Sequence, residues 1–284
     1  SSNMRPSIWL EMAKIIKDNY ELYDGFVILH GSDTMAYSAS MLSFLLEGLQ
    51  KPVIFSGSQL PIGEIRTDAR ENLMTALEIA SAKRDGISII QEVCILFDNK
   101  LFRGNRSFKY NSDKFEAFRS PNFPVLAEAG IHIRYNDEVL ANNAGQDFIC
   151  HYHIDNRVGV LKLFPGISPE TIKAVLNSDV RSIVMETFGS GNTMTDSWFL
   201  ELLQEAIKSG KNILDISQCK VGSVELGRYE TSQGLKCIGV LNGYDMTFET
   251  AVTKLMYLQG ELDSQEDVAH WVQQSLRGEL TKND

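Results

Sequence analysis

Short apolar runs alternate with helical patterns along almost the whole chain, and this alternation most restricts the fold. Residues 24–31, DGFVILHG, and residues 52–57, PVIFSG, are continuous apolar runs, which are typical of strands covered on both faces. Residues 34–50 and 67–83 have apolar side chains at helical spacing, and another apolar run follows at 88–98. This β–α–β alternation predicts an α/β fold with a mostly parallel sheet and helices on both of its faces.

The alternation breaks between residues 135 and 157, where Asn, Asp and Gly surround one short strand pattern. A segment of this kind is typical of a connection between domains. We therefore expect an N-terminal domain over residues 1–136, a linker over 137–157 and a smaller C-terminal α/β domain over 158–284. Within the C-terminal part, CIGVLN at 237–242 is expected to be a strand.

Several residues mark the expected ends of helices. Pro6 and Pro169 suit a first helical turn, where no backbone N–H is needed. Asp68 and Ser168 stand in N-capping positions. Gly210 follows a helical pattern and suits a helix C-terminus.

Composition excludes several classes of protein. The chain of 284 residues has a net charge of −10 and a pI near 5.1, which argues against a nucleic-acid surface because such a surface needs clustered Lys and Arg. No apolar stretch is long enough to span a bilayer. Cys94, Cys150, Cys219 and Cys237 form no C-x-x-C pair, and three of them have apolar, strand-like neighbours. We expect buried free thiols and a cytoplasmic location.

Two polar segments, HGSDT at 30–34 and SGSQLP at 56–61, each follow a predicted strand. Ligands of open parallel sheets bind at the carboxyl ends of strands, where helix N-termini favour an anion such as a carboxylate. Ser32 and Asp33 would suit a small zwitterionic substrate, with Asp33 meeting the ammonium and Ser32 the reacting carbonyl or a water. Simple capping of the helix by Ser and Asp is the alternative that composition leaves open.

The segment from residue 24 to residue 61 resembles the second signature of the bacterial-type L-asparaginases, usually written H-G-T-D-T, and is closest to the cytoplasmic type I branch. The similarity continues through RTDARENLMTALEIA, LFRGNRSFK, SPNFPVLAEAGIHIR, FPGIS and SLRGEL, nearly the whole chain. The resemblance implies a flavodoxin-like N-terminal domain and a smaller C-terminal α/β domain. It also implies an amidohydrolase that converts L-asparagine to L-aspartate and ammonia without a metal or a cofactor, with sites formed between paired subunits.

The resemblance further implies roles for individual residues. Ser32 matches the family's second catalytic threonine, Asp33 the aspartate that holds the substrate's amino group, and Lys109 the lysine that completes the inner Thr–Lys–Asp triad. A lysine taken out of water beside a carboxylate can exchange a proton with a hydroxyl or an attacking water. The expected substrate-binding residues are Ser1, Ser2, Gly31, Ser58, Asn192 and Tyr229.

These binding residues have different expected contacts. Ser1 and Ser2 match a dipeptide that hydrogen-bonds the substrate α-carboxylate, and the backbone carbonyl of Ser58 matches an acceptor for the substrate's side-chain amide. Asn192 matches an asparagine that approaches the site from the partner subunit, which implies self-association as a dimer or a tetramer. Tyr229 is expected to support the same site.

The chain departs from the family pattern in three places. The opening strand and its T-G-G-T-I-G segment, which holds the primary nucleophilic threonine, are not in the sequence, so we expect the 284 residues to be part of a longer polypeptide and nearly inactive by themselves. Ser32 replaces threonine, with an expected modest loss of rate. Glu186 stands where an allosterically regulated relative has arginine, so its carboxylate is expected to repel an asparagine effector, although Cys219 matches another residue of that effector site.

Other functions stay open at the level of sequence. FGSGN at 188–192 is part of a dinucleotide-binding pattern, but the third glycine and the downstream acidic residue are not evident, which counts against an oxidoreductase on the same sheet. A non-catalytic amino-acid-binding remnant and an ammonia-supplying amidotransferase subunit are further alternatives. The preference for asparagine or glutamine and the choice between dimer and tetramer are not decided.

Overall fold

The computed structural model confirms the predicted α/β class. It describes residues 1–228 and 230–282, and for residues 230 and 231 it describes the backbone alone. The chain divides into two units, unit 1 at 1–152 and unit 2 at 153–284, each described by itself below. The division falls within the expected linker 137–157, and β12 (Ile149–Cys150) in that segment pairs with β2 (Leu46–Glu47) of unit 1.

Unit 1 contains three α-helices and two 3-10 turns in the described part of the chain. The helices and turns are α1 (Pro6–Asn19), η1 (Ser32–Thr34), α2 (Met35–Leu45), α3 (Ala69–Ser81) and η2 (Gly104–Arg106). The remaining strands are β1 (Phe26–Leu29), β3 (Val53–Ser56), β4 (Lys83–Arg84), β5 (Ile87–Ser88), β6 (Val93–Phe97), β7 (Lys100–Arg103), β8 (Phe108–Lys109), β9 (Phe118–Arg119), β10 (Ala127–Ala129) and β11 (Ile133–Tyr135).

The main sheet of unit 1 has the strand order β1-β3-β6-β7-β10-β11. β1, β3 and β6 are parallel and correspond to the predicted apolar runs, whereas β7, β10 and β11 extend the sheet with antiparallel pairings. Leu29 at the end of β1 pairs with Ser56 at the end of β3, and the backbone N–H of His30 donates to the carbonyl of Ser56 at 2.8 Å. The polar segments 30–34 and 56–61 therefore leave the sheet side by side.

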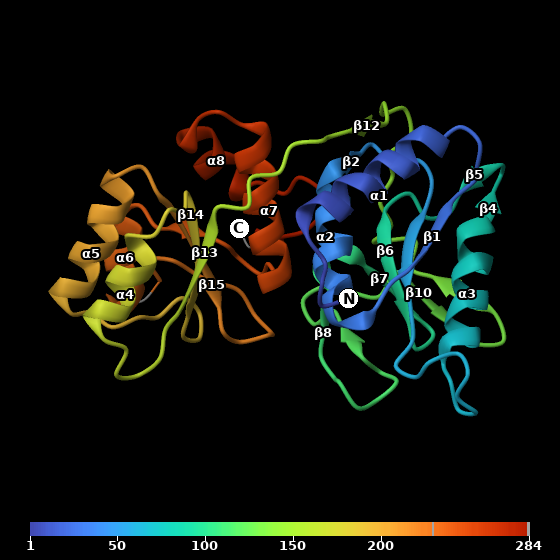
Figure 1. The fold of residues 1–284 in the computed structure, drawn as a ribbon, viewed down its shortest axis with the longest axis horizontal. Coiled ribbons are helices and arrows are strands. Elements are labelled where there is room, and N and C mark those ends of the chain that lie inside the picture. The colour runs from blue at the N-terminus through green and yellow to red at the C-terminus, as the bar shows by residue number, and fades with distance from the viewer. Residues whose placement is uncertain (229, 283–284) are drawn as a thin grey trace. The chain divides into compact units, whose positions relative to one another are not determined.

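Helix packing in unit 1 follows the apolar pattern of each helix. Pro6 occupies the start of α1, as predicted, and the helix buries Trp9, Ala13 and Ile16 on one face. All but one of the α2 side chains are buried, so α2 is a core helix that packs against β6, while α3 packs against β3. In the view of Figure 1 the main-sheet strands β1, β6, β7 and β10 lie between α2 and α3.

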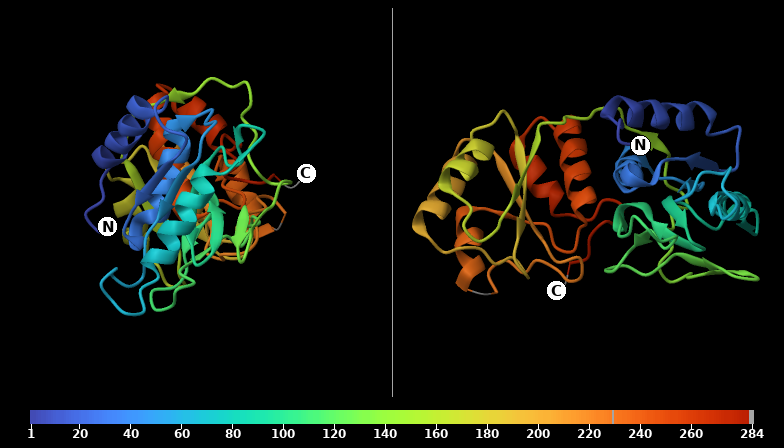
Figure 2. Two further views of the ribbon diagram at one scale, coloured as in Figure 1. Left: turned by 90° about the vertical axis from the view of Figure 1, so that its right-hand side faces the viewer. Right: turned by 60° about the horizontal axis from the view of Figure 1, so that its bottom comes forward.

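Unit 2 is a smaller parallel α/β layer structure. Its strands are β13 (Val158–Lys162), β14 (Ser182–Thr187), β15 (Asn212–Ser217) and β16 (Leu241–Asn242), parallel and adjacent in that order. Its helices are α4 (Pro169–Leu176), α5 (Ser197–Lys208), α6 (Glu230–Ile238), α7 (Phe248–Glu261) and α8 (Gln265–Val272). Figures 1 and 2 show α4, α5 and α6 on one side of this sheet and α7 and α8 on the other.

Three sequence predictions about local structure need correction. Residues 237–242 are not one strand, because Cys237 belongs to the end of α6 and only Leu241–Asn242 pair as β16. Of the cysteines, Cys94 is buried, Cys150 is half-buried, and Cys219 and Cys237 are exposed, although all four are free thiols.

The third correction concerns Asp68, which stands at the N-cap of α3 but makes no capping hydrogen bond to that helix. Its carboxylate instead accepts the backbone N–H groups of Gln59 and Leu60. The predicted caps at Ser168, which accepts from Thr171, and at Gly210, which has φ +93° after α5, are confirmed.

Candidate active site

The candidate site begins where β1 turns into α2. Gly31 is extended, and Ser32, Asp33 and Thr34 form the 3-10 turn η1 that leads into α2. A Cβ atom at Gly31 would come within 2.9 Å of the Cβ of Ser1, so a larger residue at Gly31 would displace Ser1. Thr34 Oγ1 donates to the carbonyl oxygen of Ser1 at 3.1 Å and holds the chain start against this turn.

Lys109 lies beside this turn although it is far away in the sequence. It ends β8, which pairs with β9, and its Nζ donates to Ser32 Oγ at 2.9 Å and to Asp33 Oδ1 at 2.6 Å. A hydroxyl, an amine and a carboxylate from two distant parts of the chain therefore meet in one cluster. The sequence prediction that Ser32, Asp33 and Lys109 come together is met by these distances.

The members of the cluster differ in their exposure to water. The Lys109 side chain is 17% exposed, whereas that of Asp33 is 69% exposed. The hydrogen bond and the charge of Lys109 lower the pKa of the Asp33 carboxyl, so this group stays ionised beside the lysine. The exposed carboxylate of Asp33 leaves oxygen atoms accessible to a second cation, such as the ammonium of an amino acid.

The other residues of unit 1 that the sequence predicts for the site differ in whether they contact the cluster. Ser1 is at the cluster through its contacts with Gly31 and Thr34. Ser2 is exposed, and the structure gives it no hydrogen bond to the cluster residues. Ser58 is half-buried on the turn after β3.

Two predicted residues lie in the second half of the chain. Asn192 belongs to unit 2, on the turn after β14, where its backbone N–H donates to the carbonyl of Phe188 at 2.8 Å. Gly191 before it has φ +105°, a conformation that suits glycine. Tyr229 lies outside the described residues, so its expected supporting role stays a prediction.

Sequence reasoning missed one residue that contacts the cluster, Gln59. Gln59 accepts a hydrogen bond from Ser32 Oγ at 3.3 Å through its Oε1. Gln59 lies in the polar segment 56–61 after β3, which the sequence indicated, but its contact with Ser32 depends on the fold of the 111–114 loop.

His30, at the end of the first predicted strand, is expected from the sequence to be a hydrogen-bonded structural group and not a base. Its Nδ1 donates to the carbonyl of Gly31 at 2.7 Å, and burial lowers the pKa of its imidazole.

Unit 2 has buried carboxyl groups near the ends of its own strands. Glu186 is buried, and its carboxylate forms an ion pair with Lys162 Nζ at 3.5 Å. Cys219, two residues after the end of β15, is exposed. Asp215 is fully buried and accepts from Thr187 Oγ1 at 2.7 Å. Burial raises the pKa of Asp215 to about 7.

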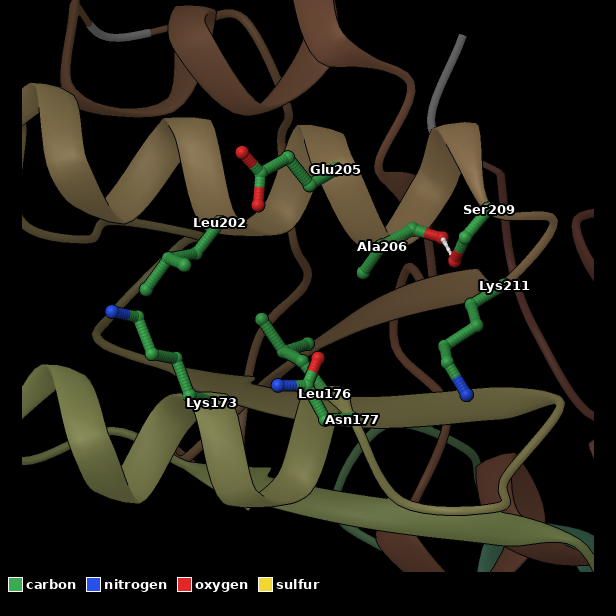
Figure 3. Close-up of a pocket in the computed structure, with 8 residues that line it drawn as sticks. All are labelled: Lys173, Leu176, Asn177, Leu202, Glu205, Ala206, Ser209 and Lys211. Carbon is green, nitrogen blue, oxygen red and sulfur yellow. Dashed lines mark hydrogen bonds between the residues drawn. The ribbon is translucent and has the colours of Figure 1, made fainter.

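A separate hollow in unit 2 lies between α4 and α5 (Figure 3). Its lining residues are Lys173, Leu176, Asn177, Leu202, Glu205, Ala206, Ser209 and Lys211. Ser209 Oγ donates to the carbonyl of Ala206, and Lys211 Nζ donates to the carbonyls of Ser178 and Val180, so these polar groups are engaged with backbone. Among the described residues, no hydrogen bond or ion pair joins the Ser209 hydroxyl, the Lys211 amine and the Glu205 carboxylate of this lining, in contrast to the cluster of unit 1.

Over 1–228 and 230–282, no three His, Cys, Asp or Glu side chains are grouped to hold a metal ion. None of the helices in that part of the chain has the length and apolar character that crossing a membrane requires.

Comparisons with known proteins cover almost the entire chain. The family model "Asparaginase, N-terminal" matches residues 1–141, and "Glutaminase/Asparaginase C-terminal domain" matches residues 157–272. The chain is 44% identical to L-asparaginase 1 of Escherichia coli (strain K12) over 284 residues, which are 100% of this chain and 82% of that protein. It is 42% identical to the 60 kDa lysophospholipase of Homo sapiens over 99% of this chain but 48% of that protein.

A solved structure agrees with these sequence matches. The crystal structure of L-asparaginase I from Vibrio cholerae O1 biovar eltor str. N16961 aligns with a TM-score of 0.92 at 43% identity, over 99% of this chain and 84% of that one. The fold and these matches define an α/β enzyme. With family models matching both halves of the chain, the protein belongs to the asparaginase family.

Proposed function

We propose that the protein hydrolyses the side-chain amide of L-asparagine to L-aspartate and ammonia. The observation that carries this proposal is the cluster in which Lys109 Nζ lies 2.9 Å from Ser32 Oγ and 2.6 Å from Asp33 Oδ1. The chain is 44% identical to the relative named L-asparaginase 1 and covers 82% of its length, which supports amide cleavage.

In the proposed chemistry, Lys109 and Ser32 manage the proton. A neutral Lys109 would take a proton from Ser32 or from a water beside it, and the resulting ammonium would return that proton to the departing nitrogen. Asp33 would bind the substrate ammonium and stabilise the charged form of Lys109. The backbone N–H groups of Ser32 and Asp33 lie at the start of η1. The first N–H groups of a helical turn have no acceptor within that turn, so these two are available to a developing oxyanion.

The remaining site residues have proposed binding roles. The backbone around Ser1 and Gly31 would face the substrate α-carboxylate, because helix N-termini favour anions. The carbonyl of Ser58 would accept from the substrate amide, and Asn192 would act from a partner subunit. The covalent first step by a threonine stays a prediction of the resemblance, and no residue of the structure is assigned to it.

The test compares Lys109→Met with Lys114→Met, a matched change at an exposed lysine on the neighbouring loop. In protein expressed from its complete coding sequence, ammonia release from L-asparagine should fall by about a hundredfold or more in Lys109→Met, because general acid–base catalysis contributes on that order. Lys114→Met should retain the rate. Full activity of a folded Lys109→Met protein would refute the proposed role, and faster turnover of L-glutamine or a lysophospholipid by the unsubstituted protein would refute the proposed substrate.

Location and assembly are also proposed. Four free cysteines, two of them exposed, are typical of a reducing compartment, so we infer a cytoplasmic protein. The expected role of Asn192 across a subunit boundary supports a dimer or a tetramer. Light scattering after gel filtration measures the assembly, and a monomer that hydrolyses asparagine at full rate would contradict the role of Asn192.

We further propose that asparagine does not activate the enzyme at a second site. Glu186 is buried and ionically paired to Lys162, so the position expected to meet an effector carboxylate presents a negative group. The rate should depend hyperbolically on asparagine concentration. A sigmoidal curve would overturn this.

A further inference from the structure

The side chain of Gln59 connects the hydroxyl of Ser32 to a loop that follows Lys109. Its Oε1 accepts from Ser32 Oγ at 3.3 Å, and its Nε2 donates to the carbonyls of Lys114 at 3.0 Å and Asn111 at 3.4 Å. We propose that Gln59 is a positioning residue that sets the direction of the Ser32 hydroxyl proton. The proposal rests on the proposed function of the same cluster.

The backbone of Gln59 is held by hydrogen bonds to the side chain of Asp68. Both carboxylate oxygens of Asp68 accept the backbone N–H of Gln59 at 3.0 Å, and one of them also accepts that of Leu60 at 3.2 Å. Asn72 Nδ2 donates to Asp68 at 3.2 Å and to the carbonyl of Gly57 at 2.9 Å. The backbone of Gln59, on the turn after β3, is therefore tied through Asp68 to the beginning of α3.

The orientation of the Gln59 amide follows from its partners. Carbonyl oxygens accept but cannot donate, so the two backbone carbonyls of Asn111 and Lys114 select the nitrogen end of the amide. The oxygen end is left facing Ser32. The amide thus presents an acceptor, and not a donor, to the hydroxyl.

This acceptor determines how Ser32 meets Lys109. A serine hydroxyl has one proton and two lone pairs. With its proton directed to Gln59 Oε1, Ser32 turns a lone pair toward the Lys109 ammonium, which donates to it at 2.9 Å. When Lys109 is neutral, the hydroxyl proton must leave Gln59 and pass to the lysine nitrogen, so that an O–H bond breaks and an N–H bond forms. Gln59 therefore holds the resting orientation from which the proposed proton transfer starts.

Two substitutions test the oxygen end and the nitrogen end of the Gln59 amide separately. Gln59→Met keeps the length of the side chain and removes both hydrogen-bonding ends, while Gln59→Glu keeps an acceptor and removes the donor to Asn111 and Lys114. Gln50→Met is the matched control, because Gln50 Nε2 also donates to a backbone carbonyl, that of Gln146, but Gln50 precedes β3 at its opposite end.

In the protein from the complete coding sequence, Gln59→Met should lower kcat for asparagine by about 10- to 100-fold, with little change in KM. The loss should not exceed the lower limit of a full proton-transfer contribution, because Gln59 acts through Ser32. Gln59→Glu should move the limb of the kcat profile that Lys109 governs to higher pH, since a new negative charge favours the ammonium. Gln50→Met should leave both unchanged. A kcat for Gln59→Met within about twofold of the parent would overturn the positioning role.

A readout independent of turnover keeps the two proposals apart. In crystals of Gln59→Met, Ser32 should occupy more than one rotamer, because one of its two hydrogen bonds is lost. A single, unchanged Ser32 rotamer with the same distance to Lys109 would contradict the inference whatever the activity. If the unsubstituted protein releases no ammonia from asparagine while Ser32 loses its order in Gln59→Met, only the proposed function fails.

Discussion

Ser32 brings to the candidate site a hydroxyl whose side chain lacks the methyl group of threonine. Its Oγ accepts from Lys109 and donates to Gln59, so two directional contacts hold a side chain that has no branch at Cβ. A β-branched residue restricts the same torsion by sterics alone. At this position two hydrogen bonds therefore restrict the side-chain torsion that a β-branched residue restricts by its shape.

The substitution Ser32→Thr tests this interpretation. The hydroxyl is retained and the added methyl narrows the torsion, so kcat for asparagine should stay equal or rise by less than about tenfold. Ser32→Ala is the contrasting variant and should lose about a hundredfold, because no hydroxyl is left to exchange a proton. Steady-state ammonia assays measure both. A tenfold loss in Ser32→Thr would mean that the pocket has no room for the methyl.

The titration of Asp33 gives a second test at the level of single residues. Lys109 lowers the pKa of the Asp33 carboxyl below its usual value of 3.8, so in Lys109→Met that pKa should rise back toward 3.8. NMR of carboxyl-labelled aspartate measures the change. Asp24 is the internal control, because its pKa is lowered by a different lysine, Lys83, and should not move.

The sign of the linked stability follows from this direction. A lowered pKa in the folded state means that the Asp33–Lys109 contact stabilises the fold above about pH 3.8 and loses that contribution as pH falls through the folded value. Asp33 is largely exposed, so the contribution is small. An unchanged Asp33 titration in Lys109→Met would place the ion pair in doubt.

Among the helices and strands, long patterns were predictable and short ones were not. β3 and β6 are buried along their whole length, which produces continuous apolar runs that sequence reasoning detects. β7 is joined to β6 by a tight turn in which Asp98 and Asn99 both have positive φ. Such a hairpin depends on backbone conformation at two residues, and its apolar pattern is too short to be distinctive.

The error at residues 237–242 has a packing cause. Gly234 in α6 lies against Leu200 of α5, where a Cβ would be 3.0 Å from Leu200 Cδ1, and Leu235 is fully buried. Tertiary contact thus makes a helix out of a segment with an internal glycine and an apolar run at its end. Intrinsic preference is a weak guide in such a case.

In the candidate site, too, some residues could be predicted from the local sequence pattern and others could not. Ser32 and Asp33 could be located from the strand end that precedes them, whereas Lys109 is 77 residues beyond Ser32 and was found only through the family resemblance. The Gln59 contact was not predictable, because it depends on which carbonyls of the 111–114 loop face the amide.

Gly210 allows a test of how one helix ends. It follows α5 with φ +93°, and its backbone N–H donates to the carbonyl of Ile207 at 2.9 Å. Gly210→Ala should lower the free energy of unfolding by about 1 kcal/mol, because an L side chain resists this conformation. Gly63→Ala is the control, since a Cβ there meets nothing within 4 Å and φ is not positive. Denaturant unfolding compares the two, and equal stabilities would contradict the assignment of the cap.

At the scale of the molecule, each unit of the chain has a core of its own. The core of unit 2 includes Leu161, Ile183 and Phe199, and Asp215 lies within the same sheet on β15, fully buried. One oxygen of this carboxyl accepts from Thr187, while the other has no hydrogen-bond partner among the described residues. The pH dependence of the whole unit's stability should therefore contain the titration of this one group.

The pKa of Asp215 is raised by burial from 3.8 to about 7, so the folded state binds the proton more tightly than the unfolded state does. Stability is then unaffected by this group below about pH 4, falls by roughly 1.4 kcal/mol per pH unit up to about pH 7, and stays lowered above it. Asp215→Asn keeps the acceptor for Thr187 and cannot ionise. Its gain in unfolding free energy over the parent should grow from about pH 4 to about pH 7 and then level off.

Asp155, in the same unit, supplies the control of opposite sign. The hydrogen bond from Arg157 lowers the pKa of Asp155 to about 2, so its ionised form is the stabilising one. Asp155→Asn should therefore be less stable than the parent by a constant amount across the range from about pH 5 to about pH 8, where Asp155 is ionised in both states. Thermal unfolding at several pH values measures both variants. A gain in Asp215→Asn that does not change with pH would show that Asp215 is already ionised in the folded protein, and that the unpartnered oxygen is satisfied.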